Sequence, residues 1–390
     1  TQGYSSAASD VYKRQGVKKE FCYGCSACAT VCPKNSIEMI PDGEGFKYPV
    51  VDNVKCVGCG LCEKACPVLQ PKSNVSSTAQ KAYGVKHNNE NVLRTSASGG
   101  FFTAISDVIL AEGGVIYGAA FDDDMMVRHF RATTARERDR MKGSKYVQSD
   151  IGDTYLLIKK DLQDGKKVLF TGTPCQTDGL KRALQGRTNN LICVDLICHG
   201  TPSPLVFADH IKMIEAKTHK RVINYCFRPK KWSWHVHREI AYLSNGKEYH
   251  SNAYSDLWRT IYYMKLATKL SCHHCQYSCL NRPGDLTMGD CRGIDAVCPG
   301  FGSDEGVSLV LVNTPTGVEY FEKVRSAMKV IELSIDDVMQ PPLREPSKQS
   351  GNRMKFMSVY QNKGYMAAVH ACLGKLYYLK YNVKKLLNKN

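Results

Sequence analysis

Residues 22–33 are Cys-Tyr-Gly-Cys-Ser-Ala-Cys-Ala-Thr-Val-Cys-Pro, and residues 56–67 are Cys-Val-Gly-Cys-Gly-Leu-Cys-Glu-Lys-Ala-Cys-Pro. In both runs two residues separate each of the first three cysteines, and the fourth cysteine is followed by proline. Thiolates at this spacing bind iron–sulfur clusters, and the fourth cysteine of each run ligates the cluster of the other run. The repeat therefore predicts two [4Fe-4S] clusters with crossed ligands.

The crossing gives each cluster three cysteines from one run and one from the other. For the first cluster we expect the ligands Cys22, Cys25, Cys28 and Cys66, and for the second Cys56, Cys59, Cys62 and Cys32. Zinc is the alternative occupant, but zinc knuckles are built from two separated cysteine pairs. Between the runs, residues 37–51 contain turn residues at 41–45 and predict a hairpin. This part of the chain resembles the bacterial two-cluster ferredoxin domain, an α+β fold.

The composition of the whole chain is that of a globular protein. It has 390 residues, of which 43% are hydrophobic, and this length allows two or three domains. Such a chain buries a full-sized core without cross-links, so its 18 cysteines indicate metal or redox chemistry. No apolar run is long enough to span a membrane, and no signal-peptide pattern opens the chain. We therefore expect a cytoplasmic protein with reduced thiols.

Composition and periodicity divide the chain into four segments. Residues 1–15 show no helical or strand period, and we expect a non-native or disordered tail. The ferredoxin domain is expected over residues 16–75, and the polar stretch 70–80 is expected to be a linker. Residues 81–340 alternate apolar strands with helical patterns, which predicts a larger α/β domain. Residues 341–390 carry ten Lys and Arg against one acid and predict a basic helical extension.

The larger domain is expected to contain six strands and six helices. The predicted strands cover residues 82–87, 115–121, 167–170, 191–197, 285–288 and 307–312. The predicted helices cover residues 99–111, 153–162, 176–184, 205–216, 256–270 and 317–328. Asn245-Gly246 is a hairpin signal, so we expect part of the sheet to be antiparallel and the sheet to be mixed.

Four further cysteines predict a third cluster. Cys175 and Cys198 each follow a predicted strand, and ligands of open α/β sheets bind at the carboxyl ends of strands. Cys272 and Cys275 form a close pair. We expect these four thiols to hold a third [4Fe-4S] cluster. Two alternatives stay open at this point: Cys175 and Cys198 as small buried apolar residues, and Cys272 with Cys275 as a zinc site completed by a histidine.

A chain with several one-electron centres needs a flavin to exchange electrons with a two-electron donor. No Gly-x-Gly-x-x-Gly follows a predicted strand, so a Rossmann site is not indicated. Two other segments offer small residues and hydroxyl groups at helix starts, where phosphate binds. The candidate cofactor residues are Ser96, Ser98, Gly99, Gly100, Ser144, Lys145 and Tyr146. The plain alternative is ordinary helix capping with a solvated lysine.

Six motifs occur in the order found in one known family. They are Ser96-x-Ser-Gly-Gly, Gly143-Ser-Lys-Tyr-Val, Gly172-Thr-Pro-Cys-Gln, Cys198-His-Gly, Ser271-Cys-x-x-Cys and Gly289-Asp290. With the ferredoxin domain in front, the chain resembles the fused bacterial form of the coenzyme F-420 hydrogenase/dehydrogenase beta-subunit family. The resemblance implies FAD and a [4Fe-4S] cluster in the second domain. Cys291-Arg292, where family members usually have aromatic residues, and the extra Cys279 are departures that leave the substrate open.

These observations predict an iron–sulfur flavoprotein oxidoreductase. Its expected partners are a redox protein or a coenzyme F-420-type hydride donor. The alternatives are a non-catalytic electron-transfer subunit of a larger complex, or a ferredoxin-fed reductase in surface-polysaccharide biosynthesis. The formal charge of +16 has no nucleic-acid recognition motif beside it, so we expect no nucleic-acid partner. The basic C-terminus predicts either a peripheral membrane contact or a helix packed on its own domain.

Overall fold

The cysteine repeat folds as two short helices and a hairpin. The structure, a computed structural model, describes residues 16–70, 80–231 and 238–374 except 251, 255 and 303, together with Tyr377 and Lys380. The predicted tail, most of the predicted linker and most of the chain after residue 374 lie outside these residues. In the first domain the elements are α2 (Ala27–Thr30), β1 (Ile37–Pro41), β2 (Lys47–Val51) and α3 (Leu61–Lys64). β1 and β2 are antiparallel, which confirms the predicted hairpin.

The backbone repeats with the sequence. α3 follows α2 at the same shift of 34 residues that relates the two cysteine runs. The left-handed φ of 66° at Gly24 returns as 67° at Gly58, and that of 65° at Ser26 returns as 71° at Gly60. The two cysteine runs therefore have nearly the same loop conformation.

The second domain is built on an eight-stranded mixed sheet, as the sequence predicted. Its strand order is β13-β3-β12-β11-β7-β6-β4-β5. The strands are β3 (Lys81–His87), β4 (Val115–Phe121), β5 (Val127–Ala132), β6 (Val168–Gly172), β7 (Leu191–Leu196), β11 (Leu286–Asp290), β12 (Ser308–Val312) and β13 (Met328–Leu333). The four central strands β11, β7, β6 and β4 are parallel, and the outer ones pair antiparallel.

Helices cover both faces of this sheet. They are α4 (Glu90–Thr95), α5 (Phe101–Ala111), α6 (Ala135–Asp139), α7 (Thr154–Gln163), α8 (Pro174–Ala183), α11 (Ile294–Val297) and α12 (Pro315–Val324). Successive strand residues alternate between the faces. On β6, Leu169 packs with α5 and α12, whereas Val168 and Phe170 pack with α7 and α8.

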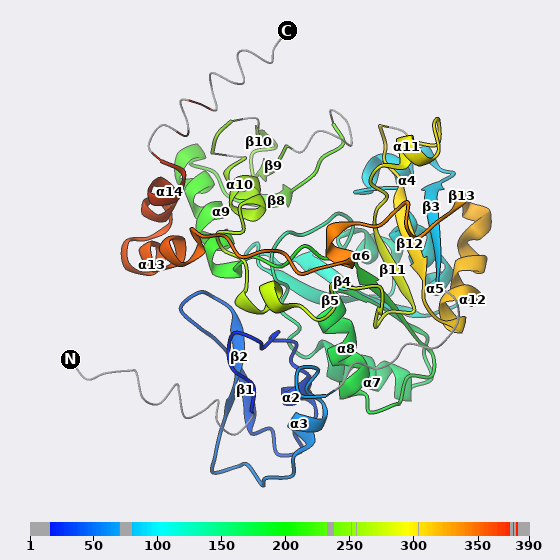
Figure 1. Cartoon of the computed structure of the whole chain (residues 1–390), viewed down its shortest axis with the longest axis horizontal. Helices are drawn as coiled ribbons and strands as arrows, with labels where there is room; N and C mark the ends of the chain where they lie inside the picture. The colour runs from blue at the N-terminus through cyan, green and yellow to red at the C-terminus, as the bar shows by residue number, and fades with distance from the viewer. Residues whose placement is uncertain are drawn as a thin grey trace.

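A third unit stands beside the sheet with a core of its own (Figure 1). It contains the small antiparallel sheet β10-β9-β8, of β8 (Val222–Cys226), β9 (Ile240–Leu243) and β10 (Glu248–His250). Its helices are α9 (Pro204–Thr218), α10 (Leu257–Tyr263), α13 (Arg353–Lys363) and α14 (Tyr365–Leu373). Residues 353–373 are therefore part of the folded body, since α14 packs on α9 and Val369 is fully buried.

The structure corrects two predictions in this unit. The Asn245-Gly246 hairpin belongs to the small sheet and not to the main one, where the antiparallel strands are β3, β5, β12 and β13. The expected helix 256–270 ends at Tyr263, and a 3-10 helix, Leu270–His274, follows it. Two further 3-10 turns are Arg325–Ala327 and Pro341–Leu343. The sequence analysis missed β5, β8 and β13, which are only five or six residues long and mix buried and exposed positions without a regular alternation.

The ferredoxin domain is fixed to the rest of the chain along α8 and along the β1–β2 turn (Figure 1). Ala27 of α2 shares one apolar core with Leu180 of α8. At the turn, Glu44 forms an ion pair of 2.5 Å with the fully buried Arg353, and Ser203 donates a hydrogen bond to the Glu44 carbonyl. Within the described residues, no helix has the length and apolar character needed to cross a membrane.

Candidate functional site

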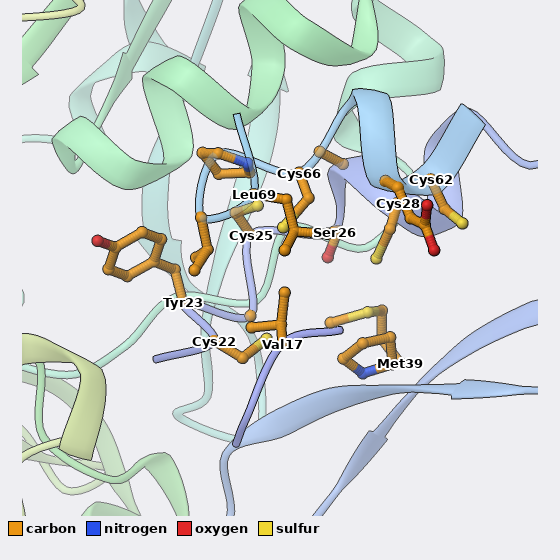
Figure 2. A pocket seen from close by; sticks show the side chains of 16 residues that line it. Val17, Cys22, Tyr23, Cys25, Ser26, Cys28, Met39, Cys62, Cys66 and Leu69 are labelled. Atoms are coloured by element: carbon orange, nitrogen blue, oxygen red, sulfur yellow. The ribbon is translucent and has the colours of Figure 1, made fainter. Parts of the chain in front are cut away.

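Three cysteines of the first run and the last cysteine of the second run line one small hollow, which we call the inner cysteine site. Its members are Cys22, Cys25, Cys28 and Cys66, as the crossing predicts, and Figure 2 shows them with Cys62 beside Cys28. Cys66 lies near enough to Cys22 and Cys28 for their charges to repel. Burial raises the pKa of the Cys22 thiol, and that of Cys25 more strongly. Thiolates here therefore need a compensating cation, which an iron–sulfur core supplies.

The other four cysteines of the repeat, the outer cysteine site, lie near the surface. Cys59 is exposed and lies near Cys62. Ser36 donates its backbone N–H to the sulfur of Cys32 over 3.3 Å, and its hydroxyl lies 3.1 Å from that sulfur. Burial opposes the effect of these contacts, but together with nearby backbone N–H groups they lower the pKa of Cys32. A place for Cys56 and Cys32 on the same cluster stays a prediction.

The third cysteine site gathers Cys175, Cys198, Cys272 and Cys275, as predicted. Cys175 lies in the first turn of α8, after β6, and interacts electrostatically with the other three. Cys198 follows β7, and burial raises its pKa to about 12. The Thr201 N–H donates to the sulfur of Cys272 over 3.4 Å. Among the described residues, no group of three or more His, Cys, Asp or Glu side chains has the geometry of a site for one metal ion.

Helix α8 connects the third site to the inner site. A Cβ on Gly179 would lie 3.0 Å from the sulfur of Cys25, so the inner site touches this helix directly. Cys175 precedes Gly179 by four residues, which places both on one helix face about 6 Å apart along the axis. Only glycine admits such a close approach at position 179. The two cysteine sites therefore lie against the same helix, one turn apart.

Cys198 also forms part of the wall of a cavity of about 470 Å³ at the carboxyl ends of β6 and β7. Two segments far apart in the sequence, residues 96–103 and 141–147, meet there. Six of the seven candidate cofactor residues line it: Ser96, Ser98, Gly100, Ser144, Lys145 and Tyr146. Tyr146 stacks on Tyr262 at 4.5 Å between ring centroids. The cavity is thus an aromatic and polar pocket that reaches the third cysteine site.

Gly99 is the one candidate cofactor residue that is not among the residues lining the cavity. A Cβ there would lie 2.0 Å from the Val85 carbonyl oxygen and 2.5 Å from the Ser308 nitrogen. The backbone that approaches Gly99 belongs to the sheet. Sequence could not distinguish this contact from a phosphate cradle, because either requires glycine.

Lys145 and the two serines have partners within the protein. The Lys145 ammonium donates to the carbonyls of Arg140, Met141 and Lys142 after α6, and burial lowers its pKa to about 7. Ser98 donates to the Val307 carbonyl, and Ser96 donates to the Val92 carbonyl. These three side chains shape the wall, but their donors are engaged.

The sequence analysis missed two polar side chains at the cavity, each with an atom available for a hydrogen bond to a ligand. Thr103, in the first turn of α5, and His129, on β5, both line it. In the part of the chain that the structure describes, Thr103 Oγ1 and His129 Nδ1 are buried without a hydrogen-bond partner. Burial lowers the pKa of His129 to about 4, so its ring is neutral at pH 7. The position of Thr103 in the first turn of a helix could have identified it from the sequence. His129 had no such signal, because its strand was not predicted.

Cationic side chains outnumber acidic ones on this wall. Lys142, Arg228, Lys265 and Arg292 line the cavity, and Asp290 is the acid among its lining residues. Arg228 forms an ion pair with Asp290, and Lys265 donates to the His199 carbonyl. The excess positive charge, together with the start of α5, favours an anionic ligand.

Comparisons with known proteins agree with this architecture. Residues 21–69 match the 4Fe-4S dicluster domain. Residues 165–338, which contain all four cysteines of the third site, match the family formed by the C-terminal part of the beta subunit of coenzyme F420 hydrogenase/dehydrogenase. Residues 165–338 of this chain are therefore similar to the C-terminal part of that beta subunit. The chain is an iron–sulfur protein related to oxidoreductases, with the dicluster domain ahead of the beta-subunit domain.

Two known proteins are similar to this chain over most of its length. One component of the F(420)H(2) dehydrogenase of Methanosarcina mazei is 21% identical over 335 residues, which are 81% of this chain and 86% of that protein. A chain of the F420-reducing [NiFe] hydrogenase complex from Methanosarcina barkeri is 18% identical, with a TM-score of 0.45 over 74% of this chain and 89% of that chain.

Proposed function

We propose that this chain is an oxidoreductase that passes electrons between a hydride donor or acceptor at the cavity and a redox partner at the outer cysteine site. The observation that carries the proposal is the position of Cys198. This residue belongs to the third cysteine site and to the cavity wall at the same time. The order of the sites is then cavity, third site, α8, inner site and outer site.

The cavity residues fit a flavin dinucleotide. A flavin, when bound, exchanges two electrons as hydride with one partner and single electrons with the other. Its diphosphate would be held at the start of α5, where Thr103 Oγ1 offers a buried donor and the cationic wall offers charge. Tyr146 and Tyr262 offer stacked rings for a planar group. His129 Nδ1 is a further buried polar atom for the ligand.

The three cysteine sites fit [4Fe-4S] clusters, each of which carries one electron. In the inner and third sites the thiols lie close together, and burial raises the pKa of Cys25 and Cys175, so thiolates there favour a cationic iron core. One relative is named as part of an F(420)H(2) dehydrogenase, and a reduced deazaflavin is therefore the hydride donor that we would try first.

The first test uses the purified full chain, reconstituted without oxygen. We expect about twelve iron atoms per chain, one FAD and reduction of an artificial dye by a soluble deazaflavin hydride donor. Eight iron atoms with zinc in place of the rest would overturn the third cluster. A loaded chain that reduces no dye with any hydride donor would instead support an electron-transfer subunit that needs a catalytic partner.

A matched pair of threonines tests the cavity. Thr103→Val removes the vacant hydroxyl at the start of α5, and we expect FAD to bind about tenfold more weakly, the value of one hydrogen bond to a charged group. Thr177→Val removes another buried, unpartnered hydroxyl, on α8 and outside the cavity wall, and FAD affinity should not change. Flavin fluorescence after dilution measures both. An equal loss of FAD affinity in both variants would show that the dinucleotide does not bind at Thr103.

A further inference from the structure

Lys269 is a cation buried beside the ferredoxin hairpin. Its side chain is 1% exposed, and its ammonium nitrogen donates to no acceptor among the residues that the structure describes. Two aromatic rings of the ferredoxin hairpin border it, with ring centroids at 3.7 Å for Tyr48 and 4.6 Å for Phe46. Ring faces attract a cation but do not replace three hydrogen bonds.

The position of Lys269 explains this arrangement. The residue lies three positions before Cys272, on the loop that leads into the third cysteine site. A Cβ on Gly24, which lies between Cys22 and Cys25, would be 3.5 Å from the Lys269 nitrogen. Its charge interacts most strongly with Cys22 of the inner site and next with Cys272 of the third site. The ammonium therefore lies between two sets of thiols on different domains.

An isolated ammonium in such surroundings is unfavourable: burial lowers the pKa of Lys269 to about 8, although the negative charges of Cys22 and Cys272 act to raise it. Four thiolates around a [4Fe-4S]2+ core carry a formal charge of about −2, and each reduction adds one electron. With clusters on both sides, the ammonium would face two anionic centres. The missing partners of Lys269 are then the clusters themselves.

We propose that Lys269 is a positioning residue for electron transfer, whose fixed positive charge stabilises the reduced forms of the inner and third clusters together. This inference rests on the proposed function, because it requires both clusters. One electron enters a cluster and no bond is formed or broken. Because one charge serves two neighbouring centres, their reduction potentials rise in parallel and stay matched. The outer cluster, near solvent, gains little from it.

The test uses the full reconstituted chain and two variants, Lys269→Met, which keeps the length and removes the charge, and Lys269→Arg, which keeps the charge. Paramagnetic resonance during a redox titration measures each midpoint potential. For Lys269→Met we expect the equilibrium constant for reducing the inner and third clusters to fall about tenfold, or 59 mV for one electron. The outer cluster should not shift, and Lys269→Arg should stay close to the parent.

Iron content separates the possible results. If the parent chain lacks the third cluster, the proposed function fails, irrespective of Lys269. If Lys269→Met holds as much iron as the parent and its potentials are unchanged, only the role of Lys269 is overturned. Equal shifts in the Met and Arg variants would also overturn it, since they would indicate packing instead of charge. If Lys269→Met loses inner and third iron that Lys269→Arg retains, the charge is required for both clusters and the proposal stands.

Discussion

The inner and outer cysteine sites come from one repeated sequence and almost one repeated backbone, yet their surroundings differ. The loop around Gly24 packs between the hairpin and α8, whereas a Cβ on the equivalent Gly58 would have no atom of the described residues within 4 Å. Cys25 is buried, and its equivalent Cys59 is exposed. The side chains around the outer site include Val54, 96% exposed, and Val57, 61% exposed. One half of the repeat thus faces the molecule's own redox domain, and the other faces solvent.

The cysteine spacing supplies the thiols that a cluster site requires, whereas the neighbouring residues set the burial and the contacts of each site. Both runs have the residues that a cluster needs. Among the residues that the structure describes, Cys25 of the inner site contacts α8 at Gly179, whereas the outer site has the exposed Cys59 with apolar neighbours on which another protein could dock. Three predictions test this asymmetry.

The largest expected effect comes from removing equivalent cysteines. Cys25→Ser should lose about four iron atoms and abolish reduction of the outer cluster by a hydride donor, because the inner site is the link to α8. Cys59→Ser should lose a similar amount of iron but leave reduction of the inner cluster intact. Freeze-quench paramagnetic resonance follows both. If the outer cluster is still reduced at the parent rate in Cys25→Ser, the order of the sites is wrong.

A smaller, several-fold effect is expected on exposure to a mild oxidant such as ferricyanide. The accessible thiolate at Cys59 should make the outer cluster decay first, and the buried inner cluster should persist. The decay of each paramagnetic signal in the parent chain gives the two rates. Equal rates for both clusters would mean that solvent reaches them alike, contrary to the difference in burial between Cys25 and Cys59.

The smallest effect is expected from alanine at the two equivalent glycines. Gly58→Ala should cost about 1 kcal/mol, the strain of a left-handed backbone. Gly24→Ala adds a Cβ 2.6 Å from the Lys47 carbonyl oxygen, and we expect about 1–3 kcal/mol more from overpacking. Urea unfolding of the two variants under identical cluster loading measures the difference. Identical urea midpoints for the two variants would show that the hairpin accommodates the added Cβ at no cost in stability.

Local patterns in the sequence were enough to predict the hairpin and the mixed sheet, and they singled out four cysteines that the fold brings together. The strand β4 and the helix α8 follow from apolar runs beside glycine and proline, signals that need no distant partner, although α8 begins two residues before its predicted start. The position of Cys175 and Cys198 follows from the rule that parallel strands end at one edge.

Other features depend on contacts between distant segments and were not predictable. The role of Gly99 depends on β3 and β12, and the partners of Lys145 depend on where α6 ends. Nothing in the sequence distinguishes Lys269 from other lysines. Its burial depends on the hairpin of another domain, which packs over its ammonium group. A small three-stranded sheet inserted between β7 and β11 has no sequence signal that separates it from the main sheet.

The contacts at the β1–β2 turn restrict how the N-terminal domain can move. Glu44 is held by the buried Arg353, Gly45 is pressed against Leu205, and Lys47 pairs with Asp150 at 2.6 Å. A domain fastened at its tip and along α8 cannot work as a swinging arm that collects charge at one place and delivers it at another. In the proposed electron path the redox centres would stay fixed relative to one another. The redox partner that binds at the exposed outer site would be the component that moves.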